Sequence, residues 1–159
     1  MSKRILVVED QEDNRQILRD LLGNAGYELV EAVDGQQALA AYAKQRPDLI
    51  LMDIQLPVMD GYETTRRIRA DPESKGIPII AVTSYALTGD EAKALAAGCN
   101  AYITKPYSIG PAQLLQALLK CLRLGLSYWI VRGQAHEHAD APHPLRFLRM
   151  HRKRPKRRK

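Results

Sequence analysis

Short apolar segments alternate with longer, partly polar ones along the first 123 residues of the chain. The apolar segments are rich in Val, Ile and Leu and predict strands at 4–9, 27–31, 48–53, 78–83 and 100–104. The segments between and after them predict helices over 13–25, 34–45, 62–70, 89–97 and 111–122. In the first of these, apolar residues recur every three or four positions, which is the spacing of one helix face.

Turn-forming residues separate these elements. Gly26 and Gly98 follow two of the helices, and Pro47 prevents the second helix from continuing. The segments 48–53 and 78–83 are apolar on both faces, as expected for central strands of a parallel sheet. Five strands alternating with helices predict an α/β fold, a flavodoxin-like (βα)5 three-layer sandwich with parallel strand order 2-1-3-4-5.

Charge divides the chain into two parts. Residues 1–123 contain 14 Lys and Arg against 16 Asp and Glu, whereas residues 124–159 contain 10 against 2. The net charge of +6 therefore comes from the second part. All four histidines also lie there, at positions 136, 138, 143 and 151. We predict one folded domain over 1–123 and a basic, mostly disordered tail over 124–159. The start of the tail, residues 124–131, is apolar and could pack on the domain as a strand or a helix extension.

Composition excludes several classes of protein. Hydrophobic residues make up 45% of the chain, which is too many for a disordered protein. No apolar run approaches the roughly 20 residues that span a membrane, and the start MSKRILVVED does not resemble a secretory signal, so we expect a cytoplasmic protein. Cys99 and Cys121 lack metal-ligand spacing and are expected to be reduced thiols, and the histidines lack the spacing of a zinc site.

Residues with useful chemistry follow four of the predicted strands. The first strand ends in Glu9 and Asp10, the third in Asp53, the fourth in Thr83, and the fifth is followed by Lys105. In such sheets, ligands bind beyond the carboxyl ends of the strands. Crowded carboxylates favour a hard divalent ion such as Mg²⁺, and a carboxylate can be a nucleophile toward phosphorus. We therefore expect a Mg²⁺-dependent phosphoryl-transfer site at this edge.

Four sequence segments in this part resemble one known family. They are ILVVED (5–10), DLILMDIQLPVMDG (48–61), IIAVTSYA (79–86) and AYITKP (101–106). In their order and spacing they resemble the receiver domains of two-component response regulators, the CheY-like superfamily, and single-domain DivK-type regulators in particular. The resemblance covers nearly all of residues 4–123.

The resemblance implies a role for each acidic residue. Asp53 would accept a phosphoryl group from a phosphohistidine of a histidine kinase or a phosphotransfer protein. Glu9, Asp10 and Asp53 would hold Mg²⁺ together with the backbone carbonyl of Gln55. Such a protein is not an enzyme in the usual sense, because it phosphorylates and dephosphorylates only itself.

The resemblance also implies how the switch works. Thr83 would hydrogen-bond the new phosphoryl oxygen, Lys105 would pair with it, and Tyr102 would turn inward when Thr83 moves. Pro57 and Gly61 would shape the loop after Asp53. The face formed by the fourth helix, fifth strand and fifth helix would then bind a partner protein, in a monomer or in a dimer linked to phosphorylation.

Each residue also has a simpler interpretation when it is considered alone. Asp53 could be a turn acid, Glu9 and Asp10 could cap the helix over 13–25, and Lys105 could be a solvated surface charge. Thr83 could bond its own backbone, and Tyr102 could be an ordinary half-buried strand aromatic.

Other functions remain as alternatives. The basic run at 145–159 could bind nucleic acid without reading its sequence, which would make the protein a receiver-gated nucleic-acid-binding regulator. The tail is also what a shifted reading frame or an inert solvated extension would give. A phosphohydrolase of the haloacid-dehalogenase type is rejected, because it needs a second Asp where this chain has Gln55.

Overall fold

A computed structural model describes residues 2–84, 89–105, 116 and 129–131. Strands and helices alternate along the described chain. They are β1 (Arg4–Val8), α1 (Glu12–Asn24), β2 (Glu28–Ala32), α2 (Gly35–Gln45), β3 (Leu49–Asp53), α3 (Gly61–Arg69), the 3₁₀ helix η1 (Pro72–Gly76), β4 (Ile79–Thr83), α4 (Asp90–Ala97), β5 (Ala101–Thr104) and β6 (Trp129–Val131). Nine of the ten predicted elements are present, and each of their bounds differs from the prediction by at most one residue.

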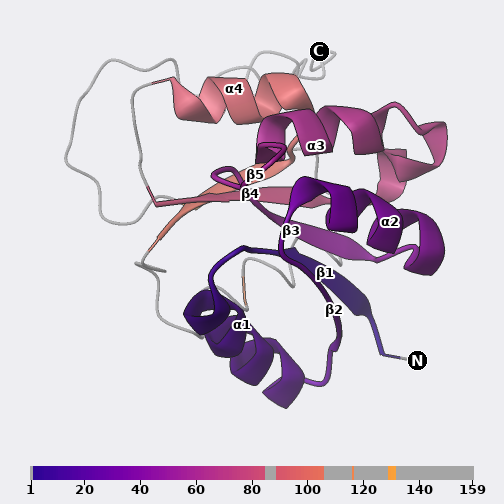
Figure 1. Cartoon of the computed structure of the whole chain (residues 1–159), viewed down its shortest axis with the longest axis vertical. Coiled ribbons are helices and arrows are strands. Elements are labelled where there is room, and N and C mark those ends of the chain that lie inside the picture. Colours follow the sequence, from indigo (N-terminus) through magenta and orange to yellow (C-terminus); the bar gives the residue numbers. More distant parts are fainter. Residues whose placement is uncertain (1, 85–88, 106–115, 117–128, 132–159) are drawn as a thin grey trace, which may run out of the picture.

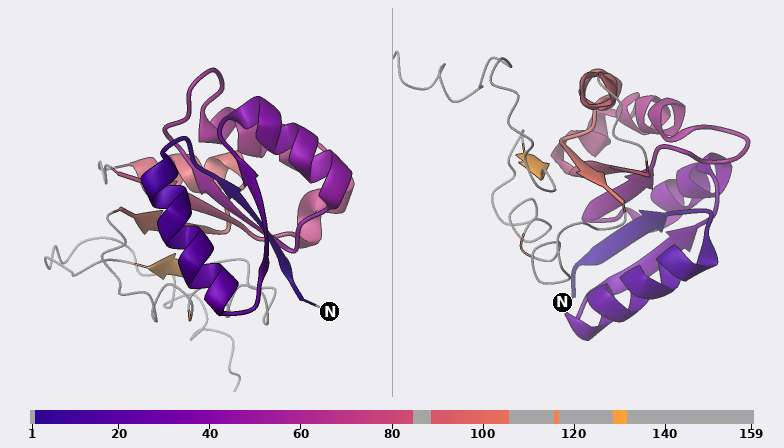
Figure 2. Two further views of the ribbon diagram at one scale, coloured as in Figure 1. Left: turned by 60° about the horizontal axis from the view of Figure 1, so that its bottom comes forward. Right: turned by 90° about the vertical axis from the view of Figure 1, so that its left-hand side faces the viewer.

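The described strands form one parallel sheet in the order β2-β1-β3-β4-β5-β6, of which Figure 1 labels β1 to β5. The predicted order 2-1-3-4-5 is confirmed. The sheet continues, however, beyond β5: β6 comes from the segment that the sequence assigned to the tail, and Trp129 to Val131 pair with Ala101 to Ile103 (Figure 2). Within the described chain, β5 is therefore an inner strand.

Helices cover both faces of the sheet, as the apolar pattern of the central strands predicts. In Figure 1, α2, α3 and α4 lie over one face and α1 lies over the other. Successive residues of a strand point to opposite faces, so Leu6 belongs to the core beneath α2 to α4 and Ile5 to the core beneath α1. All residues of β3 and β4 are buried. This burial makes the two strands a rigid platform for the residues at their carboxyl ends.

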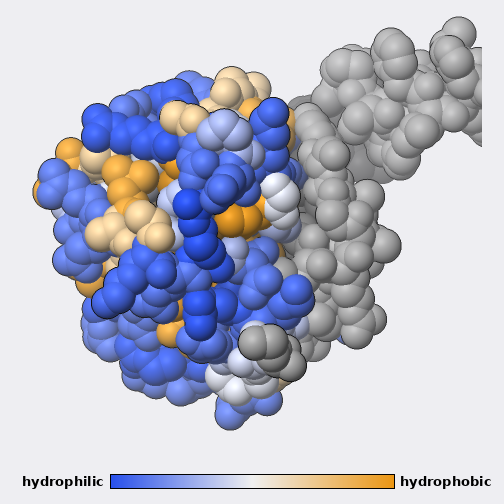
Figure 3. Space-filling view, turned by 90° about the vertical axis from the view of Figure 1, so that its right-hand side faces the viewer, coloured by the Kyte–Doolittle hydropathy of each residue, from blue (hydrophilic) through white to orange (hydrophobic). Residues whose placement is uncertain are grey.

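Apolar side chains are largely removed from the surface. The face that includes the N-terminus is mostly hydrophilic, with small apolar areas (Figure 3). Among the described residues, only Ile17 and Val58 are large hydrophobic side chains with high exposure, at 52% and 81%. None of the helices in the described chain is long and apolar enough to cross a membrane.

Helix starts follow local capping chemistry. The Asp34 carboxylate accepts a hydrogen bond from the Gln37 N–H at 2.8 Å, and Asp60 accepts one from the Glu63 N–H at 2.8 Å. The 3₁₀ helix η1 was not predicted. Asp71 and Pro72 start this short helix, because Asp71 caps it and proline fits its first position.

Some sequence predictions lie outside the described residues. These are the helix over 111–122, of which the structure describes only residue 116, Cys121, the four histidines and the basic run at 145–159. Cys99 is described: it is a free, buried thiol, and burial raises its pKa to about 11. It therefore stays protonated near neutral pH.

Gly61 lets the first turn of α3 pack against the end of β3. A Cβ atom at this position would lie 2.2 Å from the carbonyl oxygen of Asp53 and 2.8 Å from the Cα of Ile54. Both contacts are with backbone, so no side-chain rotation can relieve them. The Gly61 N–H also donates to the Ile54 carbonyl at 3.0 Å, which closes the loop between the two elements.

Gly61→Ala is expected to destabilise the protein by about 2 kcal/mol, because the β3–α3 loop must move to admit the methyl group. Urea unfolding followed by circular dichroism measures the change. Gly23→Ala is the matched control, since nothing lies within 4 Å of a Cβ at Gly23 in α1. There the same change should stabilise the helix by up to about 1 kcal/mol. Equal effects at the two positions would contradict the packing argument.

Candidate functional site

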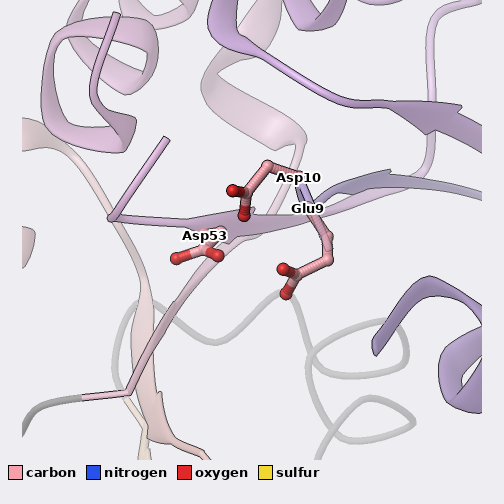
Figure 4. Close-up of side chains that lie close together, drawn as sticks. All are labelled: Glu9, Asp10 and Asp53. Atoms are coloured by element: carbon pink, nitrogen blue, oxygen red, sulfur yellow. The ribbon is translucent and has the colours of Figure 1, made fainter. Parts of the chain in front are cut away.

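The carboxyl ends of β1 and β3 bring three acidic residues together. Because these strands are neighbours in the sheet, Glu9 and Asp10, which follow β1, lie beside Asp53, the last residue of β3. One carboxylate oxygen from each of the three lies within 4.8 Å of the others (Figure 4). Glu9 and Asp53 are buried, whereas Asp10 is exposed. The cluster therefore lies at the rim, with one side open to solvent.

Glu9 is held by the backbone of its own loop. Its side chain accepts a hydrogen bond from the Gln11 N–H at 3.1 Å. Gln11 is the N-cap of α1 and makes no side-chain capping bond. The Glu9 side chain thus bonds the loop before α1. In the alternative interpretation it would instead have capped the first turn of the helix.

Lys105, the residue that follows β5, forms ion pairs with two of the three acids. Its ammonium lies 2.8 Å from the Asp53 Oδ2 atom and also forms a hydrogen-bonded ion pair with Glu9. The Lys105 side chain is 7% exposed, so it is not a solvated surface charge. The other Asp53 oxygen, Oδ1, accepts the Gln55 N–H at 2.9 Å. Asp53 is thus also a turn acid, as in the simpler interpretation: its Oδ1 atom bonds the following loop, and its Oδ2 atom pairs with Lys105.

Burial shifts the pKa values of Asp53 and Lys105. It raises the pKa of Asp53 from 3.8 to about 6, although the Lys105 ammonium and the Gln55 N–H oppose the shift. Burial lowers the pKa of Lys105, but its bonds to Asp53 and Glu9 outweigh this effect and leave the pKa raised. Asp53 is therefore largely ionised at pH 7 and poorly solvated. Without a bound metal ion, the free energy of unfolding should therefore fall as the pH rises from about 4 to about 6, because ionisation of the buried Asp53 destabilises the folded state.

Thr83 and Tyr102 lie next to each other on β4 and β5. Both are buried, with 3% and 7% exposure. Burial raises the pKa of Tyr102 to about 12, the charges of Asp90 and Glu91 on α4 add to the shift, and a side-chain hydrogen bond with Thr83 opposes it. The Tyr102 ring belongs to the core beneath α2 to α4, so it connects the end of β4 with the α4 side of the sheet.

The loop after Asp53 has an unusual backbone. Val58 has a φ of +69°, which is rare for a β-branched residue, and the Met59 N–H donates to the Pro57 carbonyl at 2.7 Å. Pro57 thus takes part in a tight turn next to the site. The predicted role of the Gln55 carbonyl as a ligand stays a prediction, since the structure defines a contact only for the Gln55 N–H.

Sequence reasoning missed Arg15. One of its guanidinium nitrogens, Nη1, donates to the backbone carbonyls of Glu9 at 2.8 Å and Asp10 at 2.9 Å. A signal was present in the sequence: a basic residue near the start of a helix is disfavoured by the helix dipole, and this suggests a specific partner.

The donor set fits a hard divalent cation. Three carboxylates carry three negative charges at one rim, and Lys105 supplies one positive charge to two of them. Carboxylate oxygens with one solvent-facing side suit Mg²⁺, which binds one or two carboxylates and keeps several waters. Glu9, Asp10 and Asp53 are the residues that would hold the ion.

Lys105→Met is expected to lower the free energy of unfolding by about 3 kcal/mol at pH 7.5 in EDTA, because it leaves two buried carboxylates without their cation. Urea unfolding followed by circular dichroism measures the loss. Added Mg²⁺ should restore part of it, since the ion supplies the missing positive charge.

Lys93→Met is the control for this substitution. Lys93 lies 3.6 Å from Asp90, with its side chain 68% exposed, so its removal should change stability by less than about 0.5 kcal/mol. A loss at Lys105 no larger than that at Lys93 would show that Lys105 does not hold the acidic cluster.

Comparison with known proteins extends this picture. The chain is 47% identical over 109 residues to the polar-differentiation response regulator DivK of Brucella anthropi, an alignment that covers 69% of this chain and 89% of that protein. It is 46% identical over 109 residues to DivK of Brucella ovis, with the same coverage.

Solved structures agree with the fold. The receiver domain of the sensor histidine kinase PA1611 of Pseudomonas aeruginosa, which has a magnesium ion coordinated in its active-site cleft, is 41% identical with a TM-score of 0.70, over 77% of this chain and 98% of that one. The chemotaxis response regulator CheY4 of Vibrio cholerae is 32% identical with a TM-score of 0.70, over 76% of this chain and 98% of that one.

The family profile of the response regulator receiver domain matches residues 5–119, which is more than half of the chain. The match includes β1 to β5 and all the residues of the acidic cluster. This chain therefore belongs to the response regulator receiver domain family of two-component signalling.

Proposed function

We propose that this protein is the phosphoacceptor of a two-component phosphorelay and that Asp53 takes the phosphoryl group from a phosphohistidine of a histidine kinase or a histidine phosphotransfer protein. The surroundings of the Asp53 carboxylate carry this proposal. Asp53 is 4% exposed, its Oδ2 atom lies 2.8 Å from the Lys105 ammonium, and its carboxylate belongs to the cluster with Glu9 and Asp10. A buried carboxylate beside a fixed cation and two further acids suits transfer of a phosphoryl group.

The chemistry is an in-line transfer to a carboxylate oxygen. An Asp53 oxygen forms a bond to phosphorus as the bond from phosphorus to the histidine nitrogen breaks, and the leaving imidazole keeps the electron pair of that bond. Burial favours this step, since a raised pKa makes the ionised carboxylate a stronger nucleophile at neutral pH.

Glu9, Asp10, Asp53 and the Gln55 carbonyl would hold the Mg²⁺ ion. When bound, the ion neutralises negative charge on the oxygens of the phosphoryl group in transfer. The Gln55 N–H keeps the Asp53 Oδ1 atom in place during this step.

Phosphorylation then changes the partners of Lys105 and Thr83. The phosphoryl group adds about 1.5 to 2 negative charges. Lys105, now bonded to Asp53 Oδ2, would turn to the phosphoryl oxygens, and the Thr83 hydroxyl would donate to one of them. Since Tyr102 shares a hydrogen bond with Thr83, its position would change too. The surface of α4, β5 and the following segment 111–122 would thus report the charge state of Asp53.

The output is a protein–protein contact. The effector is unidentified, and the domain itself, residues 1–123, offers the surface. The segment 124–159 follows as an appendage, of which β6 joins the sheet. The protein is not an enzyme toward other substrates. It would act as a monomer or as a dimer that forms on phosphorylation.

Acetyl phosphate with Mg²⁺ should add one phosphoryl group, about 80 Da, to the full chain, because small phosphodonors need only the Asp53 site. Intact-protein mass spectrometry measures the addition. Asp53→Asn should show none, since the amide is a poor nucleophile of nearly the same shape.

Asp10→Asn separates the metal from the nucleophile. It keeps Asp53 and should lower the rate of phosphorylation at least about tenfold at low Mg²⁺. Failure of the parent protein to gain mass at any Mg²⁺ concentration, or an equal gain in the Asp53→Asn variant, would overturn the proposed function.

A further inference from the structure

Arg15 contacts the backbone of two proposed cation ligands. Its Nη1 atom donates to the carbonyl of Glu9 at 2.8 Å and to the carbonyl of Asp10 at 2.9 Å. These carbonyls belong to the link between β1 and α1, so they take no part in the hydrogen bonds of α1. The side chain of Arg15 is 12% exposed, which means that its charge lies mostly under the rim.

Two acidic residues keep the Arg15 guanidinium in this place. Its Nε atom lies 3.4 Å from a carboxylate oxygen of Glu31 on β2, and its Nη2 atom pairs with Glu12 in the first turn of α1. Arg15 is thus held from β2 and from its own helix while it bonds the link between β1 and α1. Such fixed partners make it an anchor for that loop.

Anchoring these carbonyls restrains the backbone from which the Glu9 and Asp10 side chains start, and with it the direction of each Cα–Cβ bond. A single nitrogen that bonds two consecutive carbonyls restricts rotation of the peptide between them. The Gln11 N–H, which donates to the Glu9 carboxylate at 3.1 Å, belongs to the same short link. Carboxylates aimed in advance at Asp53 lose less freedom when an ion binds.

We infer that Arg15 is a positioning residue for the cation site: through the Glu9 and Asp10 carbonyls it holds both carboxylates toward Asp53. This inference rests on the proposed function. The charge of Arg15 alone would weaken binding of the cation, because a nearby positive charge repels a divalent ion. The two effects therefore predict opposite signs when Arg15 is replaced.

Arg15→Met and Arg15→Lys are expected to weaken Mn²⁺ binding by about tenfold each, the range found when groups that orient metal ligands are removed. Lys keeps the charge, but its side chain is one bond shorter than the path to the Arg15 Nη1 atom and ends in one nitrogen, so it does not reproduce the separate contacts of Nη1, Nη2 and Nε. Titration of the full chain with Mn²⁺, followed by the electron paramagnetic resonance signal of the free ion, measures the dissociation constant. Competition with Mg²⁺ repeats the comparison for the proposed ion.

Arg19→Met is the matched control. Arg19 lies one turn further along α1 and pairs with the same acids, Glu31 at 2.8 Å and Glu12 at 3.2 Å. Among the described residues, the hydrogen bonds of its guanidinium go to Glu31, Gln16 and Glu12, and none goes to the Glu9 or Asp10 carbonyl. Its replacement removes one positive charge and should change Mn²⁺ affinity by less than about threefold.

A second measurement reports the loop without any metal. In EDTA, the Gln11 amide proton should exchange with solvent faster in both Arg15 variants than in the parent and the Arg19→Met variant, because Glu9 is held less firmly. Urea midpoints from circular dichroism identify conditions in which every variant is folded.

The outcomes separate the two proposals. A parent protein that does not bind Mn²⁺ overturns the proposed function and this inference with it. A parent that binds, with Arg15→Met unchanged or tighter, or with Arg19→Met weakened equally, overturns only the inference. Weaker binding and faster Gln11 exchange confined to the Arg15 variants support it.

Discussion

The site depends on an excess of negative over positive charges among side chains that lie close together. Three carboxylates have oxygens within 4.8 Å of one another, and one buried ammonium, that of Lys105, contacts two of them. The sheet enforces this crowding, since β1 and β3 are neighbours and every residue of β3 is buried. The crowded acids favour a divalent cation, and the raised pKa of Asp53 shows how burial opposes its negative charge. The proposed cation binding and the proposed phosphoryl acceptance would both follow from this imbalance.

The same constraint explains how the site can influence a distant surface. Lys105 lies just after β5, and Thr83 ends β4, so both groups that would meet a phosphoryl oxygen belong to the β4–β5 half of the sheet. Tyr102 connects Thr83 to the core beneath α4. A change of charge at Asp53 would therefore act on the elements that carry the proposed output surface. The extra strand β6 pairs with β5 and satisfies backbone groups of what would otherwise be an exposed sheet edge.

Most of the fold and the main site residues were predictable, because both follow from short-range patterns. Doubly apolar segments such as 48–53 and 78–83 predict central parallel strands, and topology then places Glu9, Asp10, Asp53, Thr83 and Lys105 at one edge. Two features were not predicted, and a third was predicted only in outline. The 3₁₀ helix η1 depends on local capping by Asp71. The strand β6 was expected only as a strand or helix extension of the domain, because its place beside β5 depends on pairing with a distant strand. Arg15 contacts the backbone carbonyls of Glu9 and Asp10, and the sequence signals only that a basic residue near the start of a helix needs some partner.

The most direct test of the charge imbalance is the titration of the Asp53 carboxyl carbon by carbon-13 nuclear magnetic resonance, with and without Mg²⁺. In EDTA, the midpoint should lie at about pH 6, well above the ordinary value of 3.8, because burial outweighs the pairing with Lys105. Saturating Mg²⁺ should move the midpoint far below pH 6, since the cation stabilises the ionised form. A midpoint near 3.8 in EDTA that Mg²⁺ leaves unchanged would contradict the account.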